Sequence, residues 1–451
     1  MGLKIERPKS SLARFAEDVT GTVGTRMLTM ALGLVTGIIT ARMLGPENRG
    51  IFSLVALFPA TLVTLTKFGQ SQATVYFIRR EREDVSAVAS NVFVFGSVVG
   101  LTLMALVVAF ADPIRATILK GVPLWCLMIV LPMIPILLVE SYLYGALQAT
   151  DRFRVFNTRL MAESLCTLGG MAVVLWILDL GLPGALGVVI TIRLSMTAWL
   201  VTTLHAETPI HFRFDFPLFR RMIRYGMKSH IQIIASHFHF KAGVYLVAYY
   251  LSPTHVAFYA IGARLAEQMM YLPQSLGLAL FPRLAGTDDA RIHRLTAAAC
   301  RQTLLLSVGA AWFLTSVGPM AITAWYGPEY AAAGVPLRYI AWGIVMMSMY
   351  VLLSRDFTAR DRQLVNIFAA YVALIGNVVL NVILIPKMGI EGAAIGTTVS
   401  YSIAAGILFV AFVRESGLPW YSALVINRED VAMWGRLLQG ARSAVQNKLK
   451  G

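Results

Sequence analysis

Hydrophobic residues along the chain gather into blocks separated by short polar stretches rich in Gly, Pro and Arg. An α-helix of about twenty apolar residues crosses a hydrocarbon core roughly 30 Å thick, and it pairs its own backbone polar groups, as a chain in lipid must. The pattern therefore predicts an all-α polytopic membrane protein. The twelve expected spans cover residues 19–41, 50–66, 87–110, 124–147, 160–178, 184–203, 230–251, 256–281, 297–317, 336–353, 367–385 and 392–413.

Composition supports this interpretation. Of the 451 residues, 57% are hydrophobic and 14% are charged, whereas soluble domains carry about 25% charged residues. A soluble enzyme is therefore excluded. Cys126, Cys166 and Cys300 lie in apolar blocks without CxxC or Cys/His spacing, so we expect small buried side chains and neither a disulfide framework nor a metal site.

The basic residues have a marked positional bias. The net charge is +15, and Lys and Arg collect at both termini and in alternate loops, as they do on the cytoplasmic side of membrane proteins. We therefore expect both termini in the cytoplasm. Contact with anionic lipid explains the basic charge without any nucleic acid.

The spans divide the chain into five expected regions. These are a cytoplasmic N-terminus (1–18), a six-helix lobe (19–204), a cytoplasmic linker (205–229), a second six-helix lobe (230–414) and a cytoplasmic tail (415–451). Apolar residues recur at helical spacing between Val431 and Val445, which predicts an amphipathic helix at the membrane surface.

Short motifs repeat between the two halves at an offset of about 207 to 210 residues. Leu44-Gly45-Pro46 is echoed by Leu251-Ser252-Pro253. The segment at Gly181 is repeated at Gly389, and the segment at Asp151 is repeated at Asp361. Six spans per half keep the two copies in the same orientation, so we expect parallel pseudo-repeats around a central cavity, an architecture typical of transporters.

Residues 41–52 (Ala-Arg-Met-Leu-Gly-Pro-Glu-Asn-Arg-Gly-Ile-Phe) are similar to a stretch near the start of bacterial polysaccharide exporters. Further similar stretches are 145–153, 281–284 and 389–394. Over roughly residues 15 to 415 the chain resembles the O-antigen-type flippases of the multidrug/oligosaccharidyl-lipid/polysaccharide superfamily.

The resemblance implies a transporter that flips a polyprenyl-diphosphate-linked oligosaccharide to the outer leaflet by alternating access, for surface or exopolysaccharide synthesis. It also implies the inner membrane of a bacterium as the location, and membrane lipids, a polysaccharide polymerase and other assembly proteins as partners. A cation-coupled multidrug exporter of the same fold is the alternative. A third possibility, a polysaccharide polymerase or ligase, generally needs a large outer loop, which these spans do not leave, so no enzyme activity is expected.

Four basic residues, Arg26, Arg193, Lys241 and Arg264, fall inside the expected spans, where a charge needs a partner or a cavity. They are candidates for binding an anionic headgroup or sugar, because guanidinium groups bind phosphate with two hydrogen bonds. The alternative is internal ion pairing, for example between Arg264 and Glu267. Lys67, Arg301, Lys228 and Glu163 lie near span ends, where long side chains can reach the interface.

His237, Glu140 and Glu267 are candidates for ion coupling, with H⁺ or Na⁺ as the coupling ion and no other cofactor. His237 shares a helix face with Lys241, a neighbour that disfavours its charged form. A hydrogen-bonded packing histidine is the alternative for His237, and pairing with a neighbouring span is the alternative for Glu140.

Overall fold

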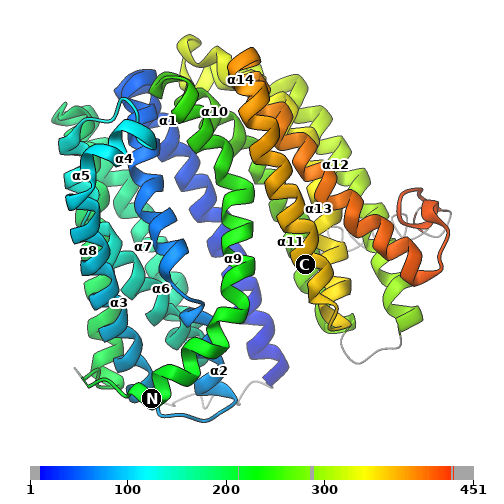
Figure 1. Cartoon of the computed structure of the whole chain (residues 1–451), viewed down its shortest axis with the longest axis horizontal. Coiled ribbons are helices and arrows are strands. Elements are labelled where there is room, and N and C mark those ends of the chain that lie inside the picture. The colour runs from blue at the N-terminus through cyan, green and yellow to red at the C-terminus, as the bar shows by residue number, and fades with distance from the viewer. Residues whose placement is uncertain (1–10, 212, 285–288, 428–429, 431–451) are drawn as a thin grey trace, which may run out of the picture. The chain divides into compact units, whose positions relative to one another are not determined.

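The computed structural model describes residues 11–211, 213–284, 289–427 and 430. Every regular element in these residues is a helix, which confirms the all-α fold class (Figure 1). In chain order the helices are α1 (Ser11–Thr66), α2 (Gln70–Arg79), α3 (Val85–Ala109), α4 (Ala111–Thr117), α5 (Leu124–Val130), α6 (Met133–Ala149), α7 (Phe153–Ala172), η1 (Val173–Ile177), α8 (Gly181–Glu207), α9 (Phe216–Tyr250), α10 (Pro253–Glu267), η2 (Gln268–Met270), α11 (Tyr271–Leu284), α12 (Asp289–Tyr326), η3 (Pro328–Ala333), α13 (Gly334–Ala359), α14 (Gln363–Ser416) and η4 (Trp420–Ala423). The predicted tail helix from Val431 to Val445 lies outside the described residues.

Two helices are too long to cross a membrane once. α1 has 56 residues and α14 has 54, which at 1.5 Å per residue is roughly 80 Å each. Each turns at a glycine, Gly45 (φ 71°, ψ 169°) or Gly389 (φ 60°, ψ −137°), a conformation that glycine adopts at no steric cost. The two arms of each helix lie side by side (Figure 1), so each helix supplies two of the expected spans.

In the described residues, eight helices are long and apolar enough to cross a membrane. The chain is therefore a multi-pass membrane protein, while the count of twelve spans stays a prediction. α9 begins at Phe216, well before the expected start at residue 230, and η2 interrupts the expected span 256–281. α7 also begins before its expected start at residue 160, at Phe153, which changes the position of the charges that it carries.

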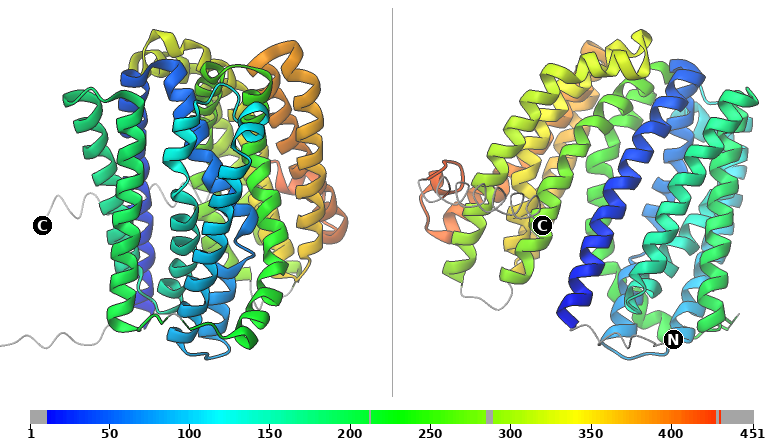
Figure 2. Two further views of the ribbon diagram at one scale, coloured as in Figure 1. Left: turned by 60° about the vertical axis from the view of Figure 1, so that its left-hand side comes forward. Right: turned by 180° about the vertical axis from the view of Figure 1, so that it is seen from behind.

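The chain forms two compact units. The N-terminal unit comprises residues up to His237 with the short segments Leu251–Ala257 and Trp325–Gly327, and the C-terminal unit comprises Phe238–Tyr250, Phe258–Ala324 and the residues from Pro328 onward. In the first unit α6 packs against α2 and α3, and the first arm of α1 runs along α7 (Figure 2). In the second unit α13 packs against α14 and α11. The predicted lobe and linker boundaries stay predictions.

The backbone carries the repeat seen in the sequence. Asp151 follows α6 with φ 57°, and Asp361 follows α13 with φ 58°. Gly181 and Gly389 likewise both have positive φ, 53° and 60°. Left-handed conformations are uncommon for residues other than glycine, so the matching pair of aspartates shows that the two halves share these turns.

Candidate functional site

Glu140 on α6 is a buried carboxylate, 5% exposed, at the centre of a charged cluster in the N-terminal unit. Its Oε1 accepts a hydrogen bond of 2.9 Å from Nη1 of Arg193 on α8. Its Oε2 lies 3.2 Å from Nη2 of Arg159 on α7 and accepts a bond of 3.3 Å from the Thr197 hydroxyl. The side chain thus joins three helices.

Glu163 on α7 completes the cluster. Its Oε1 lies 2.9 Å from Nη1 of Arg193, and its Oε2 lies 3.6 Å from Nη1 of Arg159. Two carboxylates therefore face two guanidinium groups, and the formal charges cancel. Because removing one member of a buried ion pair leaves an uncompensated charge, the four side chains stabilise each other as a set.

Arg159 is the member of this cluster that the sequence did not predict, because the expected span 160–178 left it in the preceding loop. The early start of α7 places Arg159 inside the helix, 1% exposed. Its Nε donates to the Met196 carbonyl at 2.9 Å, and its guanidinium carbon lies 4.8 Å from the centroid of the Tyr144 ring. The four-residue spacing of Arg159 and Glu163 was the available signal.

These contacts bear on two of the predicted site residues. Arg193, a candidate for substrate binding, is paired with Glu140 and Glu163, which favours the alternative of an internal ion pair. Glu140, a candidate for ion coupling, is likewise paired with neighbouring helices. A role in ligand binding or coupling stays a prediction for both residues.

The C-terminal unit contains a second intramembrane pair. Nζ of Lys241 on α9 lies 3.2 Å from both carboxylate oxygens of Glu267, at the end of α10. Sequence analysis did not name this pairing. Arg264, one helical turn before Glu267, is exposed. Arg26 on α1 is also exposed, and among the described residues no carboxylate forms an ion pair with it.

The histidines of α9 make different contacts. His237 Nε2 and the Thr61 hydroxyl share a hydrogen bond of 2.8 Å, which favours the packing alternative. His239 is 4% exposed and stacks on Tyr401 with ring centroids 4.8 Å apart. Neither ring nitrogen of His239 has a hydrogen-bond partner in the described part of the chain.

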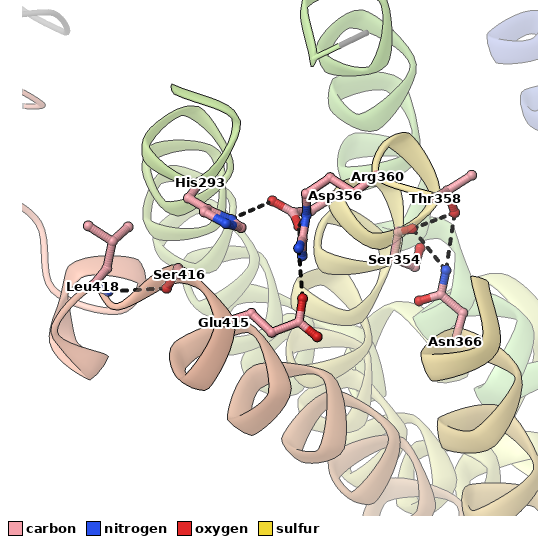
Figure 3. A network of polar contacts seen from close by, with 9 residues as sticks. All are labelled: His293, Ser354, Asp356, Thr358, Arg360, Asn366, Glu415, Ser416 and Leu418. Atoms are coloured by element: carbon pink, nitrogen blue, oxygen red, sulfur yellow. Dashed lines mark hydrogen bonds and ion pairs between the residues drawn. The ribbon is translucent and has the colours of Figure 1, made fainter. Parts of the chain in front are cut away.

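A polar network joins the ends of α12, α13 and α14 (Figure 3). Arg360 donates to Asp356 Oδ1 through Nε (2.8 Å) and Nη2 (2.6 Å), and to Glu415 through Nη1 (2.7 Å). His293 Nδ1 lies 3.4 Å from the other Asp356 oxygen. Although desolvation opposes the charged form, the hydrogen bonds that Arg360 donates to Glu415 and Asp356 raise the pKa of Arg360, so it remains a cation.

Arg301 anchors the segment after α14. It was expected to extend toward the interface, but it is 8% exposed and forms two bonds to Asp430, of 2.8 and 3.1 Å. It also donates to the Ser422 carbonyl. The hydrogen bond from Arg301 lowers the pKa of Asp430 below its ordinary value.

Cys126 and Cys300 are buried as expected, but the expectation is wrong for Cys166, which is exposed. Leu165, Cys166 and Gly169 form an exposed face of α7, so this thiol is not enclosed by other side chains. No group of three or more His, Cys, Asp or Glu side chains that could hold a metal ion occurs in the described residues.

Residues 15–287 match the family of polysaccharide biosynthesis proteins, and the chain therefore belongs to that family. A curated relative, the "Probable low-salt glycan biosynthesis flippase Agl15" of Haloferax volcanii, is 21% identical over 239 residues. The match covers 50% of this chain and 50% of the relative, so the chain matches about half the length of that protein.

Two solved structures share the fold. The lipid II flippase MurJ in an inward closed conformation superposes with a TM-score of 0.74 at 15% identity, covering 87% of this chain and 89% of MurJ. An inward-facing multidrug resistance transporter of the MATE family, in the MOP superfamily, superposes with a TM-score of 0.72 at 14% identity, covering 86% of this chain and 94% of that one. At these identities the likeness shows the fold alone.

Proposed function

We propose that the protein flips a polyprenyl-diphosphate-linked oligosaccharide from the cytoplasmic to the outer leaflet of a bacterial inner membrane by alternating access, for surface or exopolysaccharide synthesis. The family match over residues 15–287 carries this proposal. It is supported by a relative that is described as a glycan biosynthesis flippase and by a fold shared with a lipid II flippase. In this proposal both termini are cytoplasmic, and the substrates are a lipid-linked glycan and the surrounding lipids.

The charges of the described helices also support an anionic cargo. Arg26 on α1 is an exposed cation without an ion-pair partner among the described residues. A diphosphate carries negative charge that a guanidinium group binds through two hydrogen bonds. Arg26 is therefore the residue of the original four that best fits a headgroup contact, with Arg264 as the second.

A multidrug resistance transporter shares the fold, but the N-terminal unit argues against the alternative of a cation-coupled multidrug exporter. Glu140 and Glu163, which lie mid-helix in that unit, are each paired with arginines. A cationic drug would have to displace a guanidinium group from each. We keep H⁺ or Na⁺ as the coupling ion, with Glu140, Glu267 and His237 as its candidate carriers.

Charge reversal tests the proposed function. In cells that lack the native gene, complementation with Arg26→Glu or Arg264→Glu should give no surface polysaccharide, although each variant reaches the membrane at the wild-type level. Arg220→Glu, an exposed change of the same kind on α9, is the matched control and should restore the polysaccharide. Normal polysaccharide in both the Arg26 and Arg264 variants would remove these residues from the site, and wild type that fails to complement would overturn the function.

A further inference from the structure

The N-terminal unit contains a hollow of about 390 Å³ bordered by the second arm of α1, by α2 and by α6. Its volume falls in the range of small-molecule pockets, about 300–1,000 Å³. One wall is a stripe of α6 in which Glu140, Tyr144 and Gln148 are each four residues apart and so share a helix face. Ser71 and Gln72 on α2 face the same space.

The chemistry of this wall selects a class of ligand. The lining combines the apolar side chains of Ala60, Val63 and Leu137 with hydroxyls, amides, a phenol and one carboxylate. An acyl chain would match the apolar side chains but would leave the polar groups without hydrogen bonds. A phosphate would gain no net attraction here, because the arginines paired with Glu140 are already matched by carboxylates. A cation would gain little, because Arg159 and Arg193 already neutralise the carboxylates behind the wall. A neutral group that carries several hydroxyls fits all three conditions.

Two of the lining residues have hydrogen-bonding capacity left over. An ionised carboxylate has about four acceptor positions, and Glu140 accepts hydrogen bonds from Arg193 and Thr197 while forming an ion pair with Arg159. The Tyr144 hydroxyl is buried and has no hydrogen-bond partner in the described structure. Leaving such a group unpaired costs about 1–3 kcal/mol, so a partner from outside the chain is expected there.

The walls are also held in place without a ligand. Ser71 donates to the Ser141 carbonyl at 2.8 Å, which fixes α2 against α6. Gly145 packs on the Ser71 carbonyl so closely that a Cβ would lie 2.7 Å from its oxygen. Because a preformed site loses little freedom on binding, this rigidity favours recognition of a small polar group.

We infer that the Glu140–Tyr144–Gln148 face of α6 binds a neutral sugar ring, so that the N-terminal unit holds one saccharide of the cargo by itself. The inference rests on the proposed function for the source of the sugar, but binding can be measured without transport.

The test uses the full-length protein in lipid nanodiscs and saturation-transfer NMR with free glucose, galactose, mannose and N-acetylglucosamine. At least one sugar should receive saturation from the wild type. Tyr144→Phe, which keeps the ring over Arg159, should weaken that binding about three- to tenfold, the worth of one hydrogen bond. Ala60→Trp, which fills the hollow from α1, should abolish it. Ala31→Trp, at an exposed position of the same helix, is the matched control.

The outcomes separate the two proposals. If no sugar is saturated by the wild type, or if Tyr144→Phe and Ala60→Trp bind as the wild type does, the sugar site is wrong while polysaccharide complementation remains a separate observation. If sugars bind as expected but the wild type does not support surface polysaccharide, the site stands and the flippase function fails.

Discussion

The Arg193 guanidinium group on α8 lies 2.9 Å from the Glu140 carboxylate on α6, and the same Nη1 atom lies 2.9 Å from Glu163 on α7. A single nitrogen is therefore shared between two acids on two helices. Since Arg159 contacts the same two acids, the cluster links α6, α7 and α8 through charge rather than through apolar packing alone.

Glu140→Gln should destabilise the protein, because it leaves two buried or half-buried guanidinium groups facing one carboxylate. Breaking a buried pair in this way costs about 3–5 kcal/mol. Thermal unfolding followed by size-exclusion chromatography in detergent measures the effect. Glu47→Gln, an exposed position on α1, is the control and should unfold like the wild type. Equal midpoints for the two variants would show that the cluster does not hold the helices together.

Gly50→Ala should also destabilise the protein, for a steric reason. Gly50 packs directly on the backbone of Pro253, and a Cβ would overlap the Pro253 carbonyl. Overpacking of this kind costs about 1–3 kcal/mol. Gly187→Ala is the matched control, since that helical glycine has open space around its Cβ position, and alanine favours a helix by up to about 1 kcal/mol. A lower midpoint for Gly187→Ala than for Gly50→Ala would contradict the packing.

Asp356→Asn should loosen the ends of α12, α13 and α14 together. Asp356 is fully buried, and its charge is matched by Arg360 and faces His293. The amide leaves Arg360 with one charged partner, Glu415, so we expect a loss of about 3 kcal/mol or more. Hydrogen exchange at the three helix ends measures it. Asp361→Asn removes the same charge at an exposed left-handed position that asparagine tolerates, and it should leave exchange unchanged.

The Arg301–Asp430 pair predicts a defined pH dependence for the segment after α14. The pKa of Asp430 is lowered in the folded protein by the Arg301 hydrogen bond, so its contribution to stability is complete above the ordinary value of 3.8. That contribution is lost only as the pH falls through the lower, folded value. Hydrogen-exchange protection of residues 420–427 should therefore hold from neutral pH down to about 4 and decline below it.

Asp430→Asn removes the titrating group and keeps the side-chain shape. Protection of the same segment should be reduced already at neutral pH and should not change across the acid range where the wild type loses it. A wild type that loses protection between pH 5 and 7 would mean that a different group controls this segment.

Helix positions and turns could be predicted because their causes are local. The Gly45 and Gly389 turns follow from glycines between two apolar blocks, and both adopt positive φ. The family resemblance rested on the same turn residues, which explains why it identified the fold. A residue that determines a turn can be recognised in the sequence at the position of the turn itself.

The pairing of charges could not be predicted in the same way. The expected span 160–178 left Arg159 in a loop, whereas its partner Glu140 lies on another helix. Glu267 was considered with Arg264, its neighbour on α10, and the structure places Lys241 of α9 against it. Which face of a helix turns inward depends on tertiary packing, and a single sequence records only the spacing along each helix.

The matching left-handed turns at Asp151 and Asp361 align the helices that follow them, α7 and the first arm of α14. At the same offset, Arg159 and Glu163 correspond to Ala369 and Ala373, both fully buried. The two halves thus share the bends of the chain, but the positions that hold an ion pair in the N-terminal half hold alanine in the C-terminal half. These equivalent positions are therefore charged in one half and apolar in the other, so the two halves provide different local environments on the same backbone.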